Sequence, residues 1–364
     1  MKNYKYQDVK EYLINLIKAH LNEENYFLPS EKQIQVKLDV SSFTVKKAIK
    51  ELKKDKIVYG KKGVGLFVSD DAGKYLSSDK NSHVVAVCLI SSVNHFANAI
   101  QRGIMNKAEQ YGIFPLFFYS DNNEKNETKF LEKIKSIDVS GAIIYPTDAN
   151  YKNSVLEDLN KKAFPVVVVD RNVKQVGCSF VSTDHYKATF NATEQLIKQG
   201  KKRIAISIPM SISVSTMNER FRGYLDAHVS NNLSPDKRLF IDSCAPGGEL
   251  IAKTSEPFPL NVEYMEKLTA YYLKFFDENS DIDAIITVNG ISFISLLKAA
   301  KVMIANNKPI PDITVFDDDF DDISDLLGIP FTSIRQDGFK LGQIATEMLY
   351  KKITGKETEQ KVYL

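Results

Sequence analysis

The chain has 364 residues, of which 43% are hydrophobic and 26% are charged, and its formal net charge is +2. This length exceeds one typical hydrophobic core and predicts a protein of several domains. Because the first residues are polar and no apolar run approaches the roughly 20 residues that span a bilayer, the sequence argues against a membrane protein and predicts a cytoplasmic one.

The charge is distributed unevenly along the chain. Residues 1–70 carry 14 lysines and no arginine against 9 acidic residues, a net charge of +5, whereas the remainder has a net charge of −3. The segment Phe43 to Lys62 contains eight lysines against Glu51 and Asp55. Such a basic excess favours a polyanionic partner, although a solvated helix face would show the same pattern.

Three helices are predicted at the N-terminus. Apolar residues recur at helical spacing from Tyr4 to Leu21, which indicates an amphipathic helix. Ser30 begins a second, short helix as N-cap, with Gln33 three residues later, and Ser41 is the N-cap of a third. The pattern predicts a helix followed by a helix-turn-helix.

Two short strands, 57–59 and 66–68, follow around a glycine-rich tip and indicate a hairpin. Residues 70–82 are polar and without periodicity, so we expect a linker there. The predicted division is 1–69 for a DNA-binding domain of α+β type and 83–364 for a larger domain.

From His83 onward, continuous β-branched runs alternate with amphipathic helices. Such runs occur at 84–90, 141–145, 166–169, 204–208, 284–288 and 313–316. This alternation is typical of parallel sheets covered on both faces, and the number of units predicts two doubly wound lobes. We expect lobe 1 at about 83–202 and 335–353, and lobe 2 at about 203–334 and 354–364.

The N-terminal segment resembles the winged helix-turn-helix of the GntR family. The resemblance covers residues 4 to 68 and rests on Leu28-Pro29-Ser30-Glu31, Val40-Ser41, Thr44-Val45-Lys46-Lys47-Ala48 and Gly63-Val64-Gly65-Leu66-Phe67-Val68. It implies binding of double-stranded operator DNA through Ser30, Glu31, Lys32, Ser41, Ser42, Phe43, Thr44, Lys46, Lys47, Lys61, Lys62 and Gly63. The chain departs from the family at Ser42 and Lys46, where arginine is usual, and at Lys56, where glycine is usual. Bidentate arginine contacts to guanine are thus absent there, and how bases are read stays open.

The large domain resembles the effector domain of the LacI/GalR family, which has a periplasmic-binding-protein-like fold. Six motifs carry this resemblance in order, at 168–171, 181–184, 196–205, 219–224, 283–289 and 332–337. The resemblance implies a small-molecule effector, a monosaccharide or a derivative, bound by His95, Phe96, Asp170, Arg171, Asp184, Arg220, Asn289, Asp317, Asp318 and Gln336.

These residue types suit a sugar, because carboxylates, amides and guanidinium groups match vicinal hydroxyls and one aromatic ring matches an apolar C–H face. Other roles are open for two of them: Phe96 is also a plausible core residue and Asp184 a plausible helix N-cap. Asp317 and Asp318 align less cleanly with the family pattern. Gly290 replaces the aspartate that usually follows the asparagine at 289, which leaves the ligand class open.

The sequence gives little indication of a metal site or of a catalytic site. The five histidines are scattered, and Cys88, Cys178 and Cys244 form no CxxC pair, so we expect no metal, no cofactor and three buried cysteines. No nucleophile motif or catalytic triad is recognisable.

The sequence predicts a ligand-responsive transcriptional regulator, a repressor of a carbohydrate-utilisation operon, and not an enzyme. The alternative is a sugar-binding module without DNA-binding activity. Because one winged helix offers a small reading surface, we expect a homodimer that forms through the effector domain. Ligand binding should close the two lobes about crossovers near Lys201, Gln336 and Thr354.

Overall fold

A computed structural model describes residues 6–20, 26–61, 64–69, 72, 83–92, 94–147, 153–173, 176–208, 212, 214–241, 262–316, 326 and 328–364. The chain divides into two compact units, Met1–Ser82 and His83–Leu364. Among the described residues, no helix combines the length and the apolar character that a membrane crossing requires.

The N-terminal unit consists of three helices and a two-stranded sheet. Their bounds are α1 Tyr6–Ala19, α2 Glu31–Leu38, α3 Ser42–Lys54, β1 Val58–Lys61 and β2 Gly65–Val68. Ser30 and Ser41 cap α2 and α3 as predicted, and Ser30 forms a capping box with Gln33. The apolar stripes of the three helices meet in one core with Leu28 and Val58. β1 and β2 pair antiparallel, which confirms the hairpin and completes a winged helix-turn-helix.

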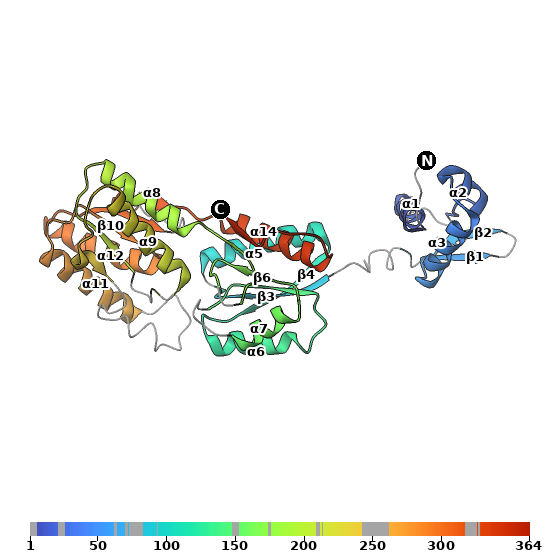
Figure 1. The fold of residues 1–364 in the computed structure, drawn as a ribbon, viewed down its shortest axis with the longest axis horizontal. Helices are drawn as coiled ribbons and strands as arrows, with labels where there is room; N and C mark the ends of the chain where they lie inside the picture. The colour runs from blue at the N-terminus through green and yellow to red at the C-terminus, as the bar shows by residue number, and fades with distance from the viewer. Residues whose placement is uncertain are drawn as a thin grey trace. The chain divides into compact units, whose positions relative to one another are not determined.

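Lobe 1 of the second unit is a six-stranded sheet in the order β13-β7-β6-β5-β3-β4, in which every neighbouring pair is parallel. Helices α5 and α14 cover one face of this sheet, and α6 and α7 cover the other (Figure 1). The bounds are β3 His83–Leu89, α5 His95–Tyr111, β4 Ile113–Tyr119, α6 Glu124–Ile134, β5 Gly141–Ile144, α7 Ser154–Lys161, β6 Val166–Val169, β7 Ser179–Ser182, α14 Gly338–Ile353 and β13 Lys361–Tyr363.

Lobe 2 is a five-stranded parallel sheet in the order β12-β11-β10-β8-β9. Helices α11 and α12 pack on one face, whereas α8 and α9 pack on the other. The bounds are α8 His185–Lys198, β8 Ile204–Ser207, α9 Ser215–Ser230, a 3₁₀ turn Lys237–Leu239, β9 Phe240–Ile241, α11 Val262–Glu278, β10 Ala284–Thr287, α12 Gly290–Ala305, β11 Asp312–Phe316 and β12 Phe331–Ile334.

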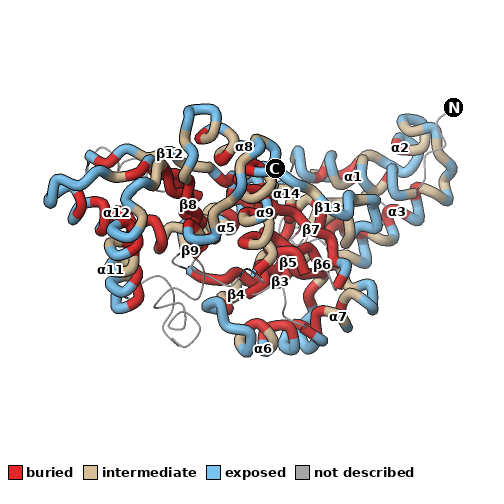
Figure 2. Tube along the Cα trace, turned by 60° about the vertical axis from the view of Figure 1, so that its left-hand side comes forward, coloured by how far each residue is buried: buried red, intermediate tan, exposed pale blue. Residues whose placement is uncertain are grey.

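The continuous apolar strands are buried on both faces, as expected of a parallel sheet between two helix layers. Figure 2 shows the central strands as buried, whereas the helices alternate between buried and exposed positions. The prediction of two doubly wound parallel lobes is therefore confirmed. Cys88 and Cys178 are free and buried, as expected, and Cys244 lies outside the described residues.

The predicted division between the lobes was wrong in two places. Helix α8 was assigned to lobe 1, but its Leu196 packs with Ile204 and Tyr224 in the core of lobe 2. Residues 354–364 were assigned to lobe 2, but β13 pairs with β7 in the sheet of lobe 1. The chain therefore crosses between β7 and α8 and again between β12 and α14, so crossovers near Lys201 and Thr354 are not found, whereas Gln336 does lie in a crossover.

Two glycine pairings hold neighbouring helices close together. A Cβ atom on Gly342 of α14 would lie 2.1 Å from the carbonyl oxygen of Ile100, and one on Gly103 of α5 would lie 2.0 Å from that of Phe339. A Cβ atom on Gly223 of α9 would lie 2.3 Å from the carbonyl oxygen of Tyr186 in α8. These close approaches require glycine. They fix the positions of α5 and α9, which both contribute residues to the pocket described next.

Candidate functional site

A pocket that is partly open to solvent lies where the two lobes face each other. Its lining comes from the segments that follow the carboxyl ends of the parallel strands, from α9 and from the second crossover. This is where ligands bind in doubly wound folds. The lining residues are Ile90, Ser91, Asn94, Phe96, Asn122, Tyr145, Asp170, Arg171, Thr216, Met217, Arg220, Val288, Asn289 and Gln336.

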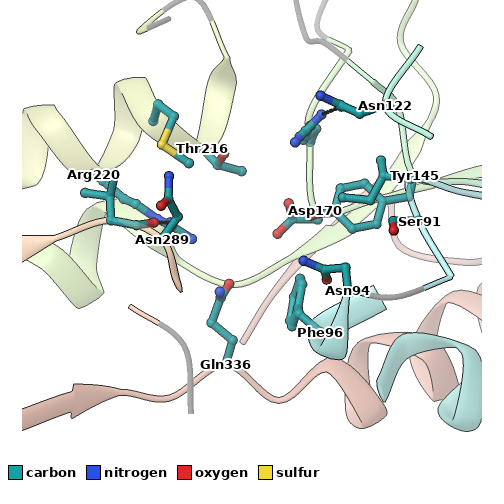
Figure 3. A pocket seen from close by; sticks show the side chains of 14 residues that line it. Ser91, Asn94, Phe96, Asn122, Tyr145, Asp170, Thr216, Arg220, Asn289 and Gln336 are labelled. Carbon is teal, nitrogen blue, oxygen red and sulfur yellow. Dashed lines mark hydrogen bonds between the residues drawn. The ribbon is translucent and has the colours of Figure 1, made fainter. Parts of the chain in front are cut away.

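Figure 3 shows how the two lobes share this pocket. Asp170 and Tyr145 project from lobe 1, Arg220 and Asn289 project from lobe 2, and Gln336 reaches in from the crossover segment after β12. A ligand between them can therefore contact both lobes at once.

Asp170 stands directly after β6 in an unusual backbone conformation. Its φ angle of 65° lies in the left-handed region, which costs energy for a residue with a Cβ atom. The backbone is held there by hydrogen bonds on both sides, because its amide donates to the Val181 carbonyl at 2.9 Å and its carbonyl accepts from the Ser182 hydroxyl at 2.8 Å. Strain retained in this way is typical of residues whose side-chain direction matters.

A buried chain of hydrogen bonds connects Asp170 of lobe 1 to Arg220 of lobe 2 through His185. The His185 Nε2 lies 3.2 Å from Asp170 Oδ1, and the Arg220 Nε donates to His185 Nδ1 at 3.3 Å. A guanidinium can only donate, so Nδ1 is the acceptor and Nε2 carries the proton. Arg220 also donates to the Val288 carbonyl and lies over the Phe316 ring at 4.0 Å.

Burial and neighbouring charges determine the protonation of this chain. Burial alone raises the pKa of Asp170, but hydrogen bonds from His185 and Tyr145 and the charge of Arg220 outweigh it, so the pKa lies below its ordinary value. Burial, together with Arg220, lowers the pKa of His185 despite the opposing effect of Asp170. At neutral pH, Asp170 is therefore a carboxylate, His185 is a neutral imidazole and Arg220 is a guanidinium cation.

Arg171 is held in lobe 1 by neutral oxygens. Its Nη1 donates to Asn122 Oδ1 at 3.0 Å and to the Pro146 carbonyl at 3.1 Å, and it also contacts the Thr147 carbonyl. The side chain is buried, and its guanidinium carbon lies 5.4 Å from the centre of the Tyr145 ring. The pocket thus contains two guanidinium groups and one carboxylate.

Two asparagines line the pocket and also cap helices. Asn94 Oδ1 accepts from the Ala97 amide at 2.8 Å, and Asn289 Oδ1 accepts from the amide and hydroxyl of Ser292 at 2.9 and 2.8 Å. Because the oxygen of each side chain is used by the cap, the amide nitrogen is the group that each can offer to a ligand.

Six of the predicted effector residues line the pocket: Phe96, Asp170, Arg171, Arg220, Asn289 and Gln336. His95 does not line it but is exposed at the first position of α5. Asp184 does not line it either, because its carboxylate caps α8 by accepting from the Lys187 amide at 2.9 Å. Asp317 and Asp318 lie outside the described residues. Phe96 combines both roles considered for it, since it also packs edge-on against Tyr145 at 6.4 Å.

The sequence did not identify Asn122, Tyr145, Thr216 or the buried bridge formed by His185. Asn122 and Tyr145 each follow a strand, so their position after the carboxyl ends of β4 and β5 was an available signal. No local signal marks His185, because its partners are 15 and 35 residues away in the chain.

The predicted DNA-binding residues lie on the N-terminal unit. Of the described members, Ser42 and Thr44 are half-buried and the others are exposed: Ser30, Glu31, Lys32, Ser41, Phe43, Lys46, Lys47 and Lys61. Lys62 and Gly63 lie outside the described residues. The wing carries an aromatic stack in which Tyr59 and Phe67 lie 5.7 Å apart, with the Lys61 ammonium 5.1 Å from the Phe67 ring.

The acidic side chains at the C-terminal part of α3 are compensated from α1. Lys10 contacts Glu51 at 3.0 Å and Asp55 at 3.4 Å. The exposed positions Lys46, Lys47 and Lys50 lie on another side of α3. This side of α3 is therefore basic, as contact with a polyanion requires.

The fold and these two sites define a class: a bilobed small-molecule-binding unit joined to a winged helix-turn-helix. Residues 85–357 match the periplasmic binding protein domain, and residues 5–68 match the bacterial regulatory proteins of the gntR family. The chain belongs to the periplasmic binding protein domain family and carries a GntR helix-turn-helix domain at its N-terminus. Both resemblances seen in the sequence are thereby confirmed.

Curated relatives include transcriptional regulators. The arabinose metabolism transcriptional repressor of Geobacillus stearothermophilus is 26% identical, over 63% of this chain and 62% of that protein. The HTH-type transcriptional regulator KdgR of Bacillus subtilis is 23% identical, over 76% of this chain and 75% of that protein.

Solved structures share the fold. The transcription regulator CcpA of Lactococcus lactis matches with a TM-score of 0.63 and 23% identity, covering 78% of this chain and 96% of that chain. The complex of the transcriptional regulator CelR with cellobiose matches with a TM-score of 0.61 and 20% identity, covering 89% of each chain.

Proposed function

We propose that this protein is a DNA-binding repressor of a carbohydrate-utilisation operon, whose operator affinity changes when a sugar-like effector binds between the lobes. It acts by binding and performs no catalysis. The observation that carries the proposal is a pocket lined from both lobes, in a chain that begins with a winged helix-turn-helix. Relatives named as repressors of arabinose metabolism and a structural neighbour bound to cellobiose support it.

The pocket chemistry favours a polyhydroxylated ligand. The guanidinium groups of Arg171 and Arg220 and the amides of Asn94 and Asn289 offer donors, Asp170 offers acceptors, and Phe96 offers an apolar ring. The pocket has one more guanidinium than carboxylate, so the ligand screen should include sugar acids and sugar phosphates beside neutral pentoses and hexoses.

Thermal shift of the full chain against this panel identifies the effector, because a ligand at about 100 times its Kd stabilises the folded state by about 2.7 kcal/mol. Asn289 then provides a sharp test. Asn289→Asp keeps the oxygen that caps α12 but removes the amide donor, so the thermal shift by the ligand should be lost while the unliganded protein stays as stable. An equal shift in wild type and variant would place the ligand elsewhere.

A gel shift with duplexes selected from a random pool decides between the repressor and the alternative, a sugar-binding module without DNA activity. We expect salt-dependent affinity that the identified effector changes, with a coupling of about 1–3 kcal/mol. Ligand binding without any affinity for DNA would support the alternative.

The proposed repressor works as a homodimer through its effector domain, with one winged helix for each operator half-site. The support is strand β4, which lies at the edge of the lobe 1 sheet and exposes Phe114 by 67% and Leu116 by 50%. An edge strand with exposed apolar side chains is the kind of surface that associates with another chain.

Effector binding is proposed to change the angle between the lobes at their two crossovers. Lobe closure can alter DNA affinity only to the extent that the ligand binds the closed and open states differently. The hydrogen bonds from Asp170 through His185 to Arg220 connect the two lobes. A ligand that contacts both Asp170 and Arg220 would therefore act on the angle between the lobes.

A further inference from the structure

Phe43 is a large apolar side chain that adds nothing to the core of the N-terminal unit, because it is exposed to solvent. It is 77% exposed on the first turn of α3. The residues that follow it at helical spacing, Lys46, Lys47 and Lys50, are exposed as well, whereas Val45 and Ala48 face the core. The exposed face of α3 is therefore basic with one aromatic ring at its N-terminal end.

Three polar residues near Phe43 are engaged within the unit: Ser41, Thr44 and Lys47. The Ser41 hydroxyl lies 2.8 Å from the Thr44 hydroxyl and accepts from the Thr44 amide at 3.2 Å. The Lys47 ammonium lies 3.9 Å from the centre of the Tyr6 ring, where a cation–π interaction holds it. The start of α3 thus offers a double helix fewer hydrogen-bonding groups than its composition indicates, and the phenyl ring becomes its most prominent feature.

A phenyl ring can match only one group on the base edges of the major groove. Each base pair presents donors and acceptors there, and the 5-methyl group of thymine is the apolar exception. Contact with a hydrogen-bonding edge would leave a polar group unpaired, whereas contact with the methyl group removes two apolar surfaces from water.

We infer that Phe43 is a specificity-determining residue that reads a thymine methyl group in each operator half-site. This inference rests on the proposed DNA-binding function and adds a recognition rule to it. At the reading helix, apolar contact then replaces the bidentate arginine contacts that Ser42 and Lys46 cannot make.

Replacing thymine by deoxyuridine tests the rule, because it removes the methyl group and keeps every hydrogen-bonding group of the base pair. The full chain is used to select duplexes from a random pool, and each thymine of the selected site is replaced in turn. We expect a roughly fourfold loss of affinity at one thymine per half-site, which corresponds to burial of one methyl group.

Phe43→Ala should bind the unsubstituted site more weakly and show no further loss at that deoxyuridine, whereas Phe43→Leu should keep part of the loss. Phe27→Ala is the matched control, because Phe27 is 64% exposed in the same unit but lies outside α3. It should show the wild-type deoxyuridine penalty.

Two results would overturn the inference and leave DNA binding intact: no thymine at which deoxyuridine weakens binding, or the same penalty in wild type and Phe43→Ala. A chain that selects no duplex and shows no salt-dependent affinity would instead overturn the proposed function, and this inference with it.

Discussion

His185 is the residue on which the electrostatics of the pocket depend. Its imidazole is fully buried, donates to Asp170 and accepts from Arg220, so protonation would break the second contact and place a cation beside a guanidinium. The structure therefore keeps this histidine neutral, and its pKa lies below the ordinary value for that reason.

A pH dependence of stability follows. Below about pH 6.5 the unfolded chain takes up a proton at His185 that the folded chain does not, so the free energy of unfolding should fall as the pH falls from about 7.5 to 5.5. Burial lowers the pKa of His228 as well, so it contributes with the same sign. Urea denaturation at several pH values measures the slope.

Matched variants separate the two histidines. His185→Asn and His228→Asn cannot titrate, and each should flatten part of the slope, whereas only His185→Asn should also alter ligand affinity, because only His185 contacts two pocket residues. A slope that neither variant changes would show that these imidazoles do not control it.

Lys56 shows how a departure from a family pattern acts at the level of one element. It follows α3 with a φ angle of 58°, in the left-handed region where the GntR pattern has glycine. Replacement by glycine relieves the clash of the Cβ atom, so Lys56→Gly should stabilise the N-terminal unit by about 1 kcal/mol.

Lys54→Gly is the control for this substitution, because Lys54 lies two residues before Lys56 and still belongs to α3, as its last residue. It should destabilise the same unit by up to about 1 kcal/mol. Calorimetry of the full chain measures both, and a change of the same sign in the two variants would contradict the account of Lys56.

At the crossing of α5 and α14, replacement of a glycine should destabilise the protein. Gly342→Ala would place a methyl group against the Ile100 carbonyl, and this backbone oxygen cannot move without shifting the helix. We expect a loss of about 1–3 kcal/mol in the stability of the second unit. Met105→Ala, at an exposed position of α5, should change it much less, and denaturant titration compares the two.

The sequence predicted most of the central strands, because their composition reflects burial on both faces, but it did not predict β7. The edge strands depart from this pattern in two ways. β4 is apolar, but Pro115 interrupts it, and proline counts against a strand in the sequence. β13 has only Val362 between a lysine and a tyrosine. Neither strand was predicted, for these physical reasons.

The position of the lobe boundary is a property of the whole molecule and left no local trace. The segment from β7 into α8 looks like any short loop between a strand and a helix, and it became a crossover only because Leu196 packs in the second lobe. The same applies to the pocket: motifs indicated Asp170, Arg171 and Asn289, but the partner of Asp170 comes from a helix that the sequence placed in the wrong lobe.

Assembly is the remaining prediction at this scale. Light scattering of the full chain should give twice the monomer mass of 41.1 kDa at micromolar concentration. Phe114→Lys with Leu116→Lys should shift the mass toward the monomer and weaken operator binding. The control is Val302→Lys, at a 42% exposed position of α12 in the other lobe. A monomeric wild type, or a dimer that the β4 variant leaves intact, would contradict the proposed interface.

Lobe 2 is one continuous stretch of chain, whereas lobe 1 is closed by α14 and β13, which come after it. During synthesis, the face of the first sheet on which α5 packs through Ile100 and Ile104 is therefore not fully covered until α14 is made, more than 200 residues later. The second lobe can complete its own core in the meantime. The nascent chain thus exposes apolar surface of the incomplete lobe 1 for most of its translation. Lobe 1 should therefore depend more on chaperones than lobe 2, and a prematurely terminated chain should aggregate through it.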